Sequence, residues 1–93
     1  MELKDTIELM NSDDYKDRFK AEYYQAKIRY DKLHNMLVKH AAGTLNFEPS
    51  CPQEILEDQE YYMKDYLKTL EIRAEIEKIE LWLENNLWIL KKF

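Results

Sequence analysis

The scarcity of residues that turn or break a helix is the feature that most constrains how this chain can fold. Among its 93 residues there is one glycine, Gly43, and there are two prolines, Pro49 and Pro52. Tight β-hairpins and phosphate-binding glycine loops need more glycine than this, so the sequence argues against a β-rich fold, a dinucleotide fingerprint and a P-loop. With 45% hydrophobic and 35% charged residues, the composition is typical of a folded helical protein rather than a disordered chain. We therefore expect an all-α fold.

The spacing of apolar and capping residues predicts three helices in a single domain spanning residues 1–93. Apolar residues at helical spacing predict a short first helix over about residues 2–10. A second helix is expected over about residues 13–41. Ser12 is suited to its N-cap, and Gly43 is suited to the left-handed position that follows a helix.

The third helix should follow a loop over residues 43–51 and begin at about Pro52, because proline is favoured in the first turn of a helix. It should extend to about residue 90, and Asn85–Asn86 leave open whether it is continuous. Between Ser12 and Gly43 there are seven basic and five acidic residues, a net charge of +2. From Cys51 to Phe93 there are six basic and ten acidic residues, a net charge of −4. This opposite bias favours a long antiparallel helical hairpin.

Apolar residues fall on two faces of the third helix. One face should pack against a heptad-like seam of the second helix, made by Phe19, Tyr23, Ala26, Tyr30, Leu33 and Leu37. The third helix should also extend past its partner from Trp82 onward. Because one neighbouring helix covers only one face, we expect a homo-oligomer. The residues predicted for its interface are Ile72, Ile76, Ile79, Leu83 and Trp88.

The residues that usually carry catalysis or bind metal form no recognisable constellation. His34 and His40 are six residues apart, so they lie on different faces of one helix and do not chelate a metal together. A single cysteine, Cys51, excludes an intramolecular disulfide and a cysteine-based zinc cluster. No histidine is placed by the sequence to act as its base, so Cys51 is more typical of a cap or packing residue than of a nucleophile. We expect a protein that is not an enzyme and has no metal or cofactor.

Charge and hydropathy patterns also limit the partners of the chain. Its uninterrupted apolar runs are of four residues or fewer, such as Leu87–Leu90, so no segment is expected to span a membrane. No signal peptide opens the sequence, and a cytoplasmic location is expected. A net charge of −5 disfavours general nucleic-acid binding but leaves room for a small anion at a local basic site.

An aromatic and basic pattern on the second helix is the most informative candidate for a binding site. Tyr23, Lys27 and Tyr30 share one face, and tyrosine rings stack on nucleobases while lysine and arginine bind phosphates. Two alternatives remain open at this point: the tyrosines also suit the helix seam, and Arg73 also suits an ion pair with Glu77 or a bridge between helices. The candidate ligand-binding residues are Tyr15, Arg18, Tyr23, Lys27, Arg29 and Arg73.

Two stretches of the chain carry a family resemblance. The first contains Tyr23, Lys27, Arg29, Lys32 and Leu33, and the second contains Gln59, Met63, Tyr66, Leu67, Leu70, Arg73 and Ala74. In these residues the chain resembles small helical-hairpin proteins of crAss-like and other gut phages. More remotely, the plan of a short helix before a hairpin is similar to the hairpin domain of phage anti-CBASS and anti-Thoeris sponge proteins. The resemblance covers roughly residues 13–81. It implies an oligomer in the bacterial host cell that sequesters a cyclic nucleotide immune signal in pockets between subunits.

Two further functions are compatible with the same residues. The ten acidic residues from Cys51 onward suit a protein-binding inhibitor of a host nuclease or CRISPR complex that presents an acidic helical face. The two-faced third helix also suits a structural oligomeric adaptor without a ligand. Binding of a cyclic nucleotide distinguishes the first function from these two.

Overall fold

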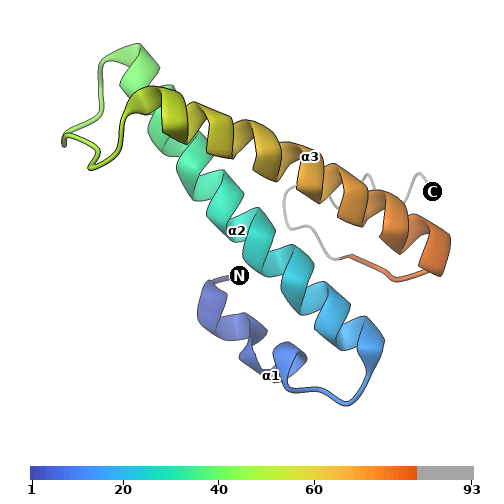
Figure 1. The fold of residues 1–93 in the computed structure, drawn as a ribbon. Helices are drawn as coiled ribbons and strands as arrows, with labels where there is room; N and C mark the ends of the chain where they lie inside the picture. The colour runs from blue at the N-terminus through green and yellow to red at the C-terminus, as the bar shows by residue number, and fades with distance from the viewer. Residues whose placement is uncertain (82–93) are drawn as a thin grey trace.

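The computed structural model describes residues 1–81, and all regular structure in this range is helical. A short 3₁₀ helix, η1 (Leu3–Thr6), runs into α1 (Ile7–Met10), and two long helices follow, α2 (Tyr15–Ala42) and α3 (Gln53–Glu77). Helices α2 and α3 form an antiparallel hairpin, and α1 lies against the first half of α2 (Figure 1). The predicted all-helical hairpin with a short first helix is therefore confirmed for these residues, and the homo-oligomer stays a prediction.

The N-terminal cap of α2 is Asp14, two residues later than the predicted Ser12. A carboxylate oxygen of Asp14 accepts a hydrogen bond from the backbone N–H of Lys16 at 3.0 Å. Ser12 Oγ instead accepts from the backbone N–H of Asp14 at 3.0 Å and donates to Asp17 at 2.8 Å. Asp14 directly precedes the first helical residue, so its side chain reaches the unpaired amides first, and Ser12 supports the cap from outside the helix.

The other end of α2 follows the prediction. Gly43 adopts a left-handed conformation with φ of 77°. Its N–H donates to the carbonyl of His40 at 3.1 Å, and the N–H of Thr44 donates to the carbonyl of Lys39 at 2.9 Å. These bonds satisfy two of the last carbonyls of α2 and turn the chain into the loop that leads to α3.

Helix α3 ends at Glu77, so the prediction of a helix up to about residue 90 is wrong. Lys78 adopts a left-handed conformation with φ of 58°, and the N–H of Ile79 donates to the carbonyl of Ala74 at 2.9 Å. Ile79 and Leu81 then enter the core. A left-handed non-glycine residue costs about 1–2 kcal/mol. Burying an apolar side chain of this size gains about 1.5–3 kcal/mol, so burying two outweighs the cost of the turn.

This turn also corrects part of the predicted oligomer interface. Ile79 is buried within its own chain and is not available to a second copy. Ile72 and Ile76, in contrast, are 51% and 73% exposed on α3. No other helix of the described chain covers these two side chains, so they are accessible to a second copy. Leu83 and Trp88, and with them Trp82 and Asn85–Asn86, lie outside the described residues.

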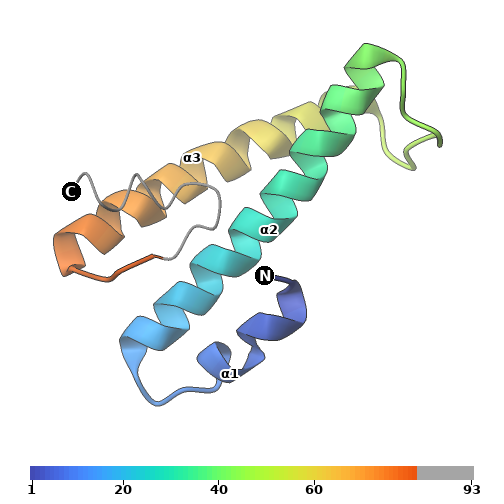
Figure 2. The same cartoon turned by 180° about the vertical axis from the view of Figure 1, so that it is seen from behind.

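The core lies toward the end of the hairpin that carries α1, where α2 and α3 diverge (Figure 2). Its buried members are Phe19, Tyr23 and Tyr24 from α2, Leu67, Leu70 and Ala74 from α3, and Ile79 and Leu81 after the turn. Leu9 of α1 and Ala26 and Tyr30 of α2 pack against this cluster. Most of the predicted seam of α2 therefore faces the core. Ile79 and Leu81, which follow α3, pack into the same core.

Candidate ligand-binding site

Four side chains of α2 and α3 meet at the end of the hairpin opposite the loop, and we name them the open-end cluster: Tyr15, Phe19, Arg73 and Glu77. Arg73 Nε donates to Glu77 Oε2 at 3.1 Å, and the guanidinium lies over the ring of Phe19, 4.9 Å from its centroid. Tyr15 Oη donates to Glu77 Oε1 at 3.0 Å and accepts a hydrogen bond from Arg73. Two candidate residues that are 58 positions apart in sequence are therefore in direct contact.

The charge of Arg73 is compensated within this cluster. The hydrogen bond with Glu77 is the largest cause that raises the pKa of the Arg73 guanidinium, and it is also the largest cause that raises the pKa of Tyr15. The ion pair suggested by the sequence between Arg73 and Glu77 is thus present. Both side chains are partly exposed, at 44% and 33%, and exposed ion pairs of this kind are weak. An incoming phosphate can therefore compete with Glu77 for Arg73.

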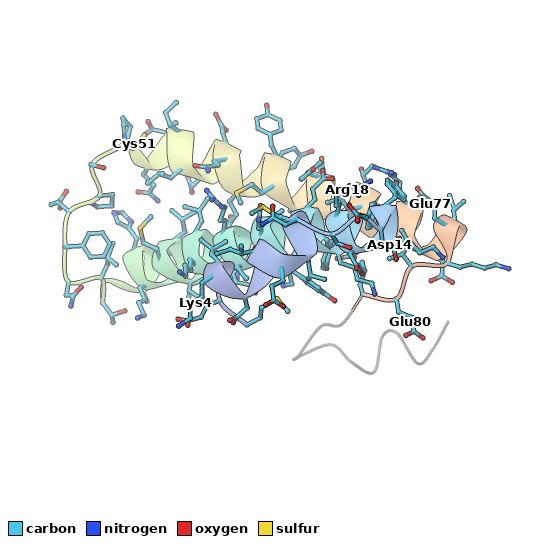
Figure 3. All side chains as sticks on the ribbon, turned by 90° about the horizontal axis from the view of Figure 1, so that it is seen from below. Lys4, Asp14, Arg18, Cys51, Glu77 and Glu80 are labelled. Carbon is cyan, nitrogen blue, oxygen red and sulfur yellow. The ribbon has the colours of Figure 1, made fainter. Side chains whose placement is uncertain are left out.

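Arg18 lies at the same end of the molecule as the labelled Glu77, and Cys51 lies at the other end (Figure 3). One of its guanidinium nitrogens donates to the backbone carbonyl of Ser12 at 2.8 Å. This bond holds the side chain against the segment that precedes α2. Arg18 therefore adds positive charge near the open-end cluster without belonging to it.

Tyr23 lies in the core rather than on a binding surface. Its side chain is 0% exposed, its ring packs edge-on against Tyr24, and its Oη donates to Glu71 Oε2 at 2.6 Å. Burial raises the pKa of the Tyr23 hydroxyl, and the hydrogen bond to Glu71 raises it further. Neither ring face is open to a ligand in this arrangement. For Tyr23 the structure thus favours the core-seam alternative over stacking on a base.

Lys27 and Arg29 lie near the middle of α2, away from Arg73. Lys27 Nζ is 2.8 Å from a carboxylate oxygen of Asp31 and 5.8 Å from the centroid of the Tyr30 ring. Arg29 is exposed and forms no ion pair with any other residue in the described range. Arg29 follows Tyr15 by 14 positions, about 21 Å along the helix axis. A single chain therefore does not bring Lys27, Arg29 and Arg73 together around one small ligand.

A cavity that sequence reasoning missed lies at the other end of α2, and we name it the loop cavity. It has a volume of about 440 Å³, which is within the range of small-molecule sites. It is lined by Lys32, Asn35, Met36 and Lys39 of α2 and by Thr44, Leu45, Asn46 and Phe47 of the loop. The signal in the sequence is the pair Lys32 and Lys39, seven residues apart and hence on one face of α2, followed by Phe47.

Several other kinds of site are absent from the part of the chain that the structure describes. No three His, Cys, Asp or Glu side chains gather there as a metal site would require. His34 Nδ1 is paired with Glu60 at 2.7 Å rather than with His40. Over residues 1–81, no helix has both the length and the apolar character needed to cross a bilayer.

A model of the Sequestin family matches residues 13–76, which include all of α2 and α3 except Glu77. The match covers more than half of the chain, which therefore belongs to the Sequestin family. No curated protein and no solved structure matches the chain. The family name indicates a protein that sequesters a ligand rather than one that transforms it. This agrees with the resemblance of the hairpin to sponge proteins.

Proposed function

We propose that this protein is a phage-encoded anti-defence protein that binds and sequesters a cyclic nucleotide immune signal in the host cytoplasm, without catalysis. The observation that carries the proposal is the Sequestin family match over residues 13–76, because it covers the hairpin itself rather than an appended segment. A sponge protein needs a binding surface and no catalytic group. The basic and aromatic side chains of the hairpin can provide that surface.

The open-end cluster supports the proposal chemically. Arg73 presents a planar guanidinium, the group best matched to phosphate oxygens, beside the half-exposed ring of Tyr15. A phosphate that replaces Glu77 leaves the contact of Arg73 with Phe19 in place. Tyr15 is then available to stack on a base.

An oligomer would complete this site. Arg73 follows Ile72, which is exposed together with Ile76 on the outer face of α3. If a second copy packs against this face, Arg73 lies at the boundary between the subunits. The exposed Arg29 of the second copy, or its Lys27, can then contribute the positive charge that one chain does not bring to the same place.

Ligand binding tests the proposal directly. We expect one compound from a panel of cyclic dinucleotides, cyclic trinucleotides and cyclic ADP-ribose isomers to raise the melting temperature of the protein, since a ligand that binds only the folded state stabilises it. In calorimetry, Arg73→Ala should weaken binding of that compound by about tenfold to a hundredfold. Lys64→Ala, which removes another base from α3, is the matched control and should bind like wild type. If no panel member binds wild type with a Kd below about 10 μM, the sponge proposal fails.

The oligomer is tested separately by its size in solution. Ile76→Glu places a carboxylate in the proposed interface and should reduce the mass measured by light scattering while helix content is retained. Val38→Glu alters another exposed apolar residue, on α2, and should leave the mass unchanged. A monomeric wild-type protein would contradict the interface.

The acidic side of α3 supports a second candidate function. Glu57, Asp58, Asp65 and Glu75 are all exposed on α3, and none forms an ion pair with another residue among the first 81. Such a face suits a protein-binding inhibitor of a nuclease or CRISPR complex that occupies a basic nucleic-acid site. A structural adaptor is the remaining alternative. Failure of the nucleotide panel would favour these two.

A further inference from the structure

The loop cavity is a locally positive site in an acidic protein. Two lysines, Lys32 and Lys39, line it, and no Asp or Glu among residues 1–81 does. Neither lysine forms an ion pair with any other residue that the structure describes. The chain as a whole has a net charge of −5, so these two charges stand out from their surroundings. An anion that enters the cavity meets bases whose charge is not already compensated, unlike that of Arg73.

The geometry of the cavity suits a ligand with an anionic part and a flat part. Lys32 and Lys39 are two turns apart on α2, about 10 Å along the helix axis, so their flexible side chains can meet one phosphate or two neighbouring ones. Asn35 and Met36 lie between them on the wall of the cavity. Phe47 lines the cavity from the loop and is 55% exposed, which leaves ring surface open for contact with a base.

The end of a helix is ordinarily unfavourable to an anion, because the last carbonyls carry about half a negative charge. Here that effect is reduced, since the carbonyls of Lys39 and His40 accept hydrogen bonds from Thr44 and Gly43. Two full positive charges from Lys32 and Lys39 exceed the remaining dipole. These same bonds also hold the start of the loop against α2, so one wall of the cavity is fixed by the helix cap.

We propose that the loop cavity is a second binding site, which takes a nucleotide by its phosphates and its base. Lys32 and Lys39 bind the phosphates, Phe47 stacks on the base, and the side-chain amides of Asn35 and Asn46 bond to its edge. The inference rests on the proposed function in that its ligand belongs to the same chemical class. It differs in place, because this site is formed within one chain and at the opposite end of the hairpin from Arg73.

The site can be tested by NMR on the full-length, isotope-labelled protein with three probes: ADP, pyrophosphate and adenosine. We expect ADP to shift the backbone amide signals of residues 44–47, with pyrophosphate giving a smaller shift and adenosine the smallest. Lys32→Ala and Lys39→Ala should each weaken ADP binding by about two- to fivefold, and added salt should weaken it further. Phe47→Leu should weaken binding of ADP but not of pyrophosphate. Lys16→Ala, which removes an exposed base from the other end of α2, should have no effect on the loop signals.

The outcomes separate the cavity from the proposed function. If none of the three probes shifts residues 44–47 at millimolar concentration, the cavity inference is overturned, whatever the cyclic nucleotide panel shows. If a cyclic nucleotide binds but shifts only signals near Tyr15 and Arg73, the sponge proposal stands and the cavity inference again falls. If ADP shifts the loop signals while no cyclic nucleotide binds, the cavity is supported and the sponge proposal fails.

Discussion

The two ends of the hairpin carry the same kinds of side chain, bases beside aromatic rings, but differ in what compensates the bases. At the open end, Arg73 is already bonded to Glu77 and Tyr15 and lies over Phe19. At the loop end, Lys32 and Lys39 line a cavity to which no acidic residue of the described chain contributes. A ligand at the open end must exchange one partner for another, whereas a ligand at the loop end gains its contacts without displacing a carboxylate. Where an anion binds most readily thus depends on whether a basic side chain already has an acidic partner, as well as on where the basic side chains lie.

The two ends also differ in how they are packed. The core cluster joins the first half of α2 to the second half of α3 and the turn after it. Toward the loop, the contacts between the helices include the surface pair of His34 and Glu60, and Phe47 is exposed. Stability is therefore concentrated at the open end. Regions with few buried contacts, such as the loop end, are where proteins tolerate ligand-induced rearrangement.

The largest expected effect tests the difference in packing between the two ends of the hairpin. Leu70 is 2% exposed in the core cluster, so Leu70→Ala should lower the free energy of unfolding by about 2–5 kcal/mol. Phe47→Ala should lower it by less, about 1 kcal/mol, although more side chain is removed, because Phe47 is 55% exposed. Urea unfolding followed by circular dichroism measures both. Equal losses would show that the loop end is as important to the fold as the open end.

A smaller effect is expected from the buried tyrosine of the core. Tyr23→Phe leaves Glu71 without its donor and should lower the free energy of unfolding by about 1 kcal/mol at neutral pH. The pKa of Tyr23 is raised by burial and by Glu71. A group whose pKa is raised on folding contributes stability that is complete below its unfolded pKa, about 10, and is lost as the pH rises above it. Wild type should therefore lose stability in alkali more steeply than Tyr23→Phe, as thermal melts at several pH values would show. Parallel pH profiles would contradict the buried hydrogen bond.

The helix cap beside the loop cavity should give an effect of similar or smaller size. Gly43→Ala forces a side chain into the left-handed region at φ of 77° and should cost about 1 kcal/mol, although no atom lies within 4 Å of the added carbon. Gly43→Asn should cost less, since asparagine tolerates this conformation. Both values come from urea unfolding. If alanine is as stable as glycine, then the cap is not held as the structure shows.

The smallest expected effect on stability comes from a variant that tests the difference in charge compensation between the two ends of the hairpin. Glu77→Gln removes the carboxylate that compensates Arg73, and because the pair is partly exposed the melting temperature should change little. Affinity for a nucleotide at the open end should nevertheless rise severalfold, as measured by calorimetry with the compound that binds wild type. Glu75→Gln makes the same change of charge at an exposed position of α3. If both variants raise the affinity equally, then net charge rather than the release of Arg73 is responsible.

Features governed by local chemistry could be predicted from the sequence, and features governed by distant packing could not. Gly43 predicts the end of α2 because the left-handed cap is a property of that residue. The end of α3 gives no such signal, since Lys78 has no preference for a positive φ and is held there by the burial of Ile79 and Leu81. Because the cause is long-range and leaves no local signal, the sequence alone predicts that the third helix continues.

The same distinction holds for the site. The pair of Arg73 with Glu77 follows from their spacing of four residues on one helix. The contact of Arg73 with Tyr15 depends on the register between α2 and α3, which periodicity alone does not set. The loop cavity depends on how residues 44–47 fold back on α2, so the helical pattern around Lys32 and Lys39 does not by itself predict a cavity there.

Sequestration is tested most directly by whether the protein retains a nucleotide and releases it chemically unchanged. The purified protein is mixed with each compound of the cyclic nucleotide panel, passed over a filter that retains only protein-bound ligand, and then unfolded by heat. Mass spectrometry of the released material identifies and quantifies the compound. Sequestration predicts that one compound is retained in near-stoichiometric amount and released with its original mass. A released product of different mass would show catalysis, and passage of every compound through the filter would show that the protein does not sequester these nucleotides.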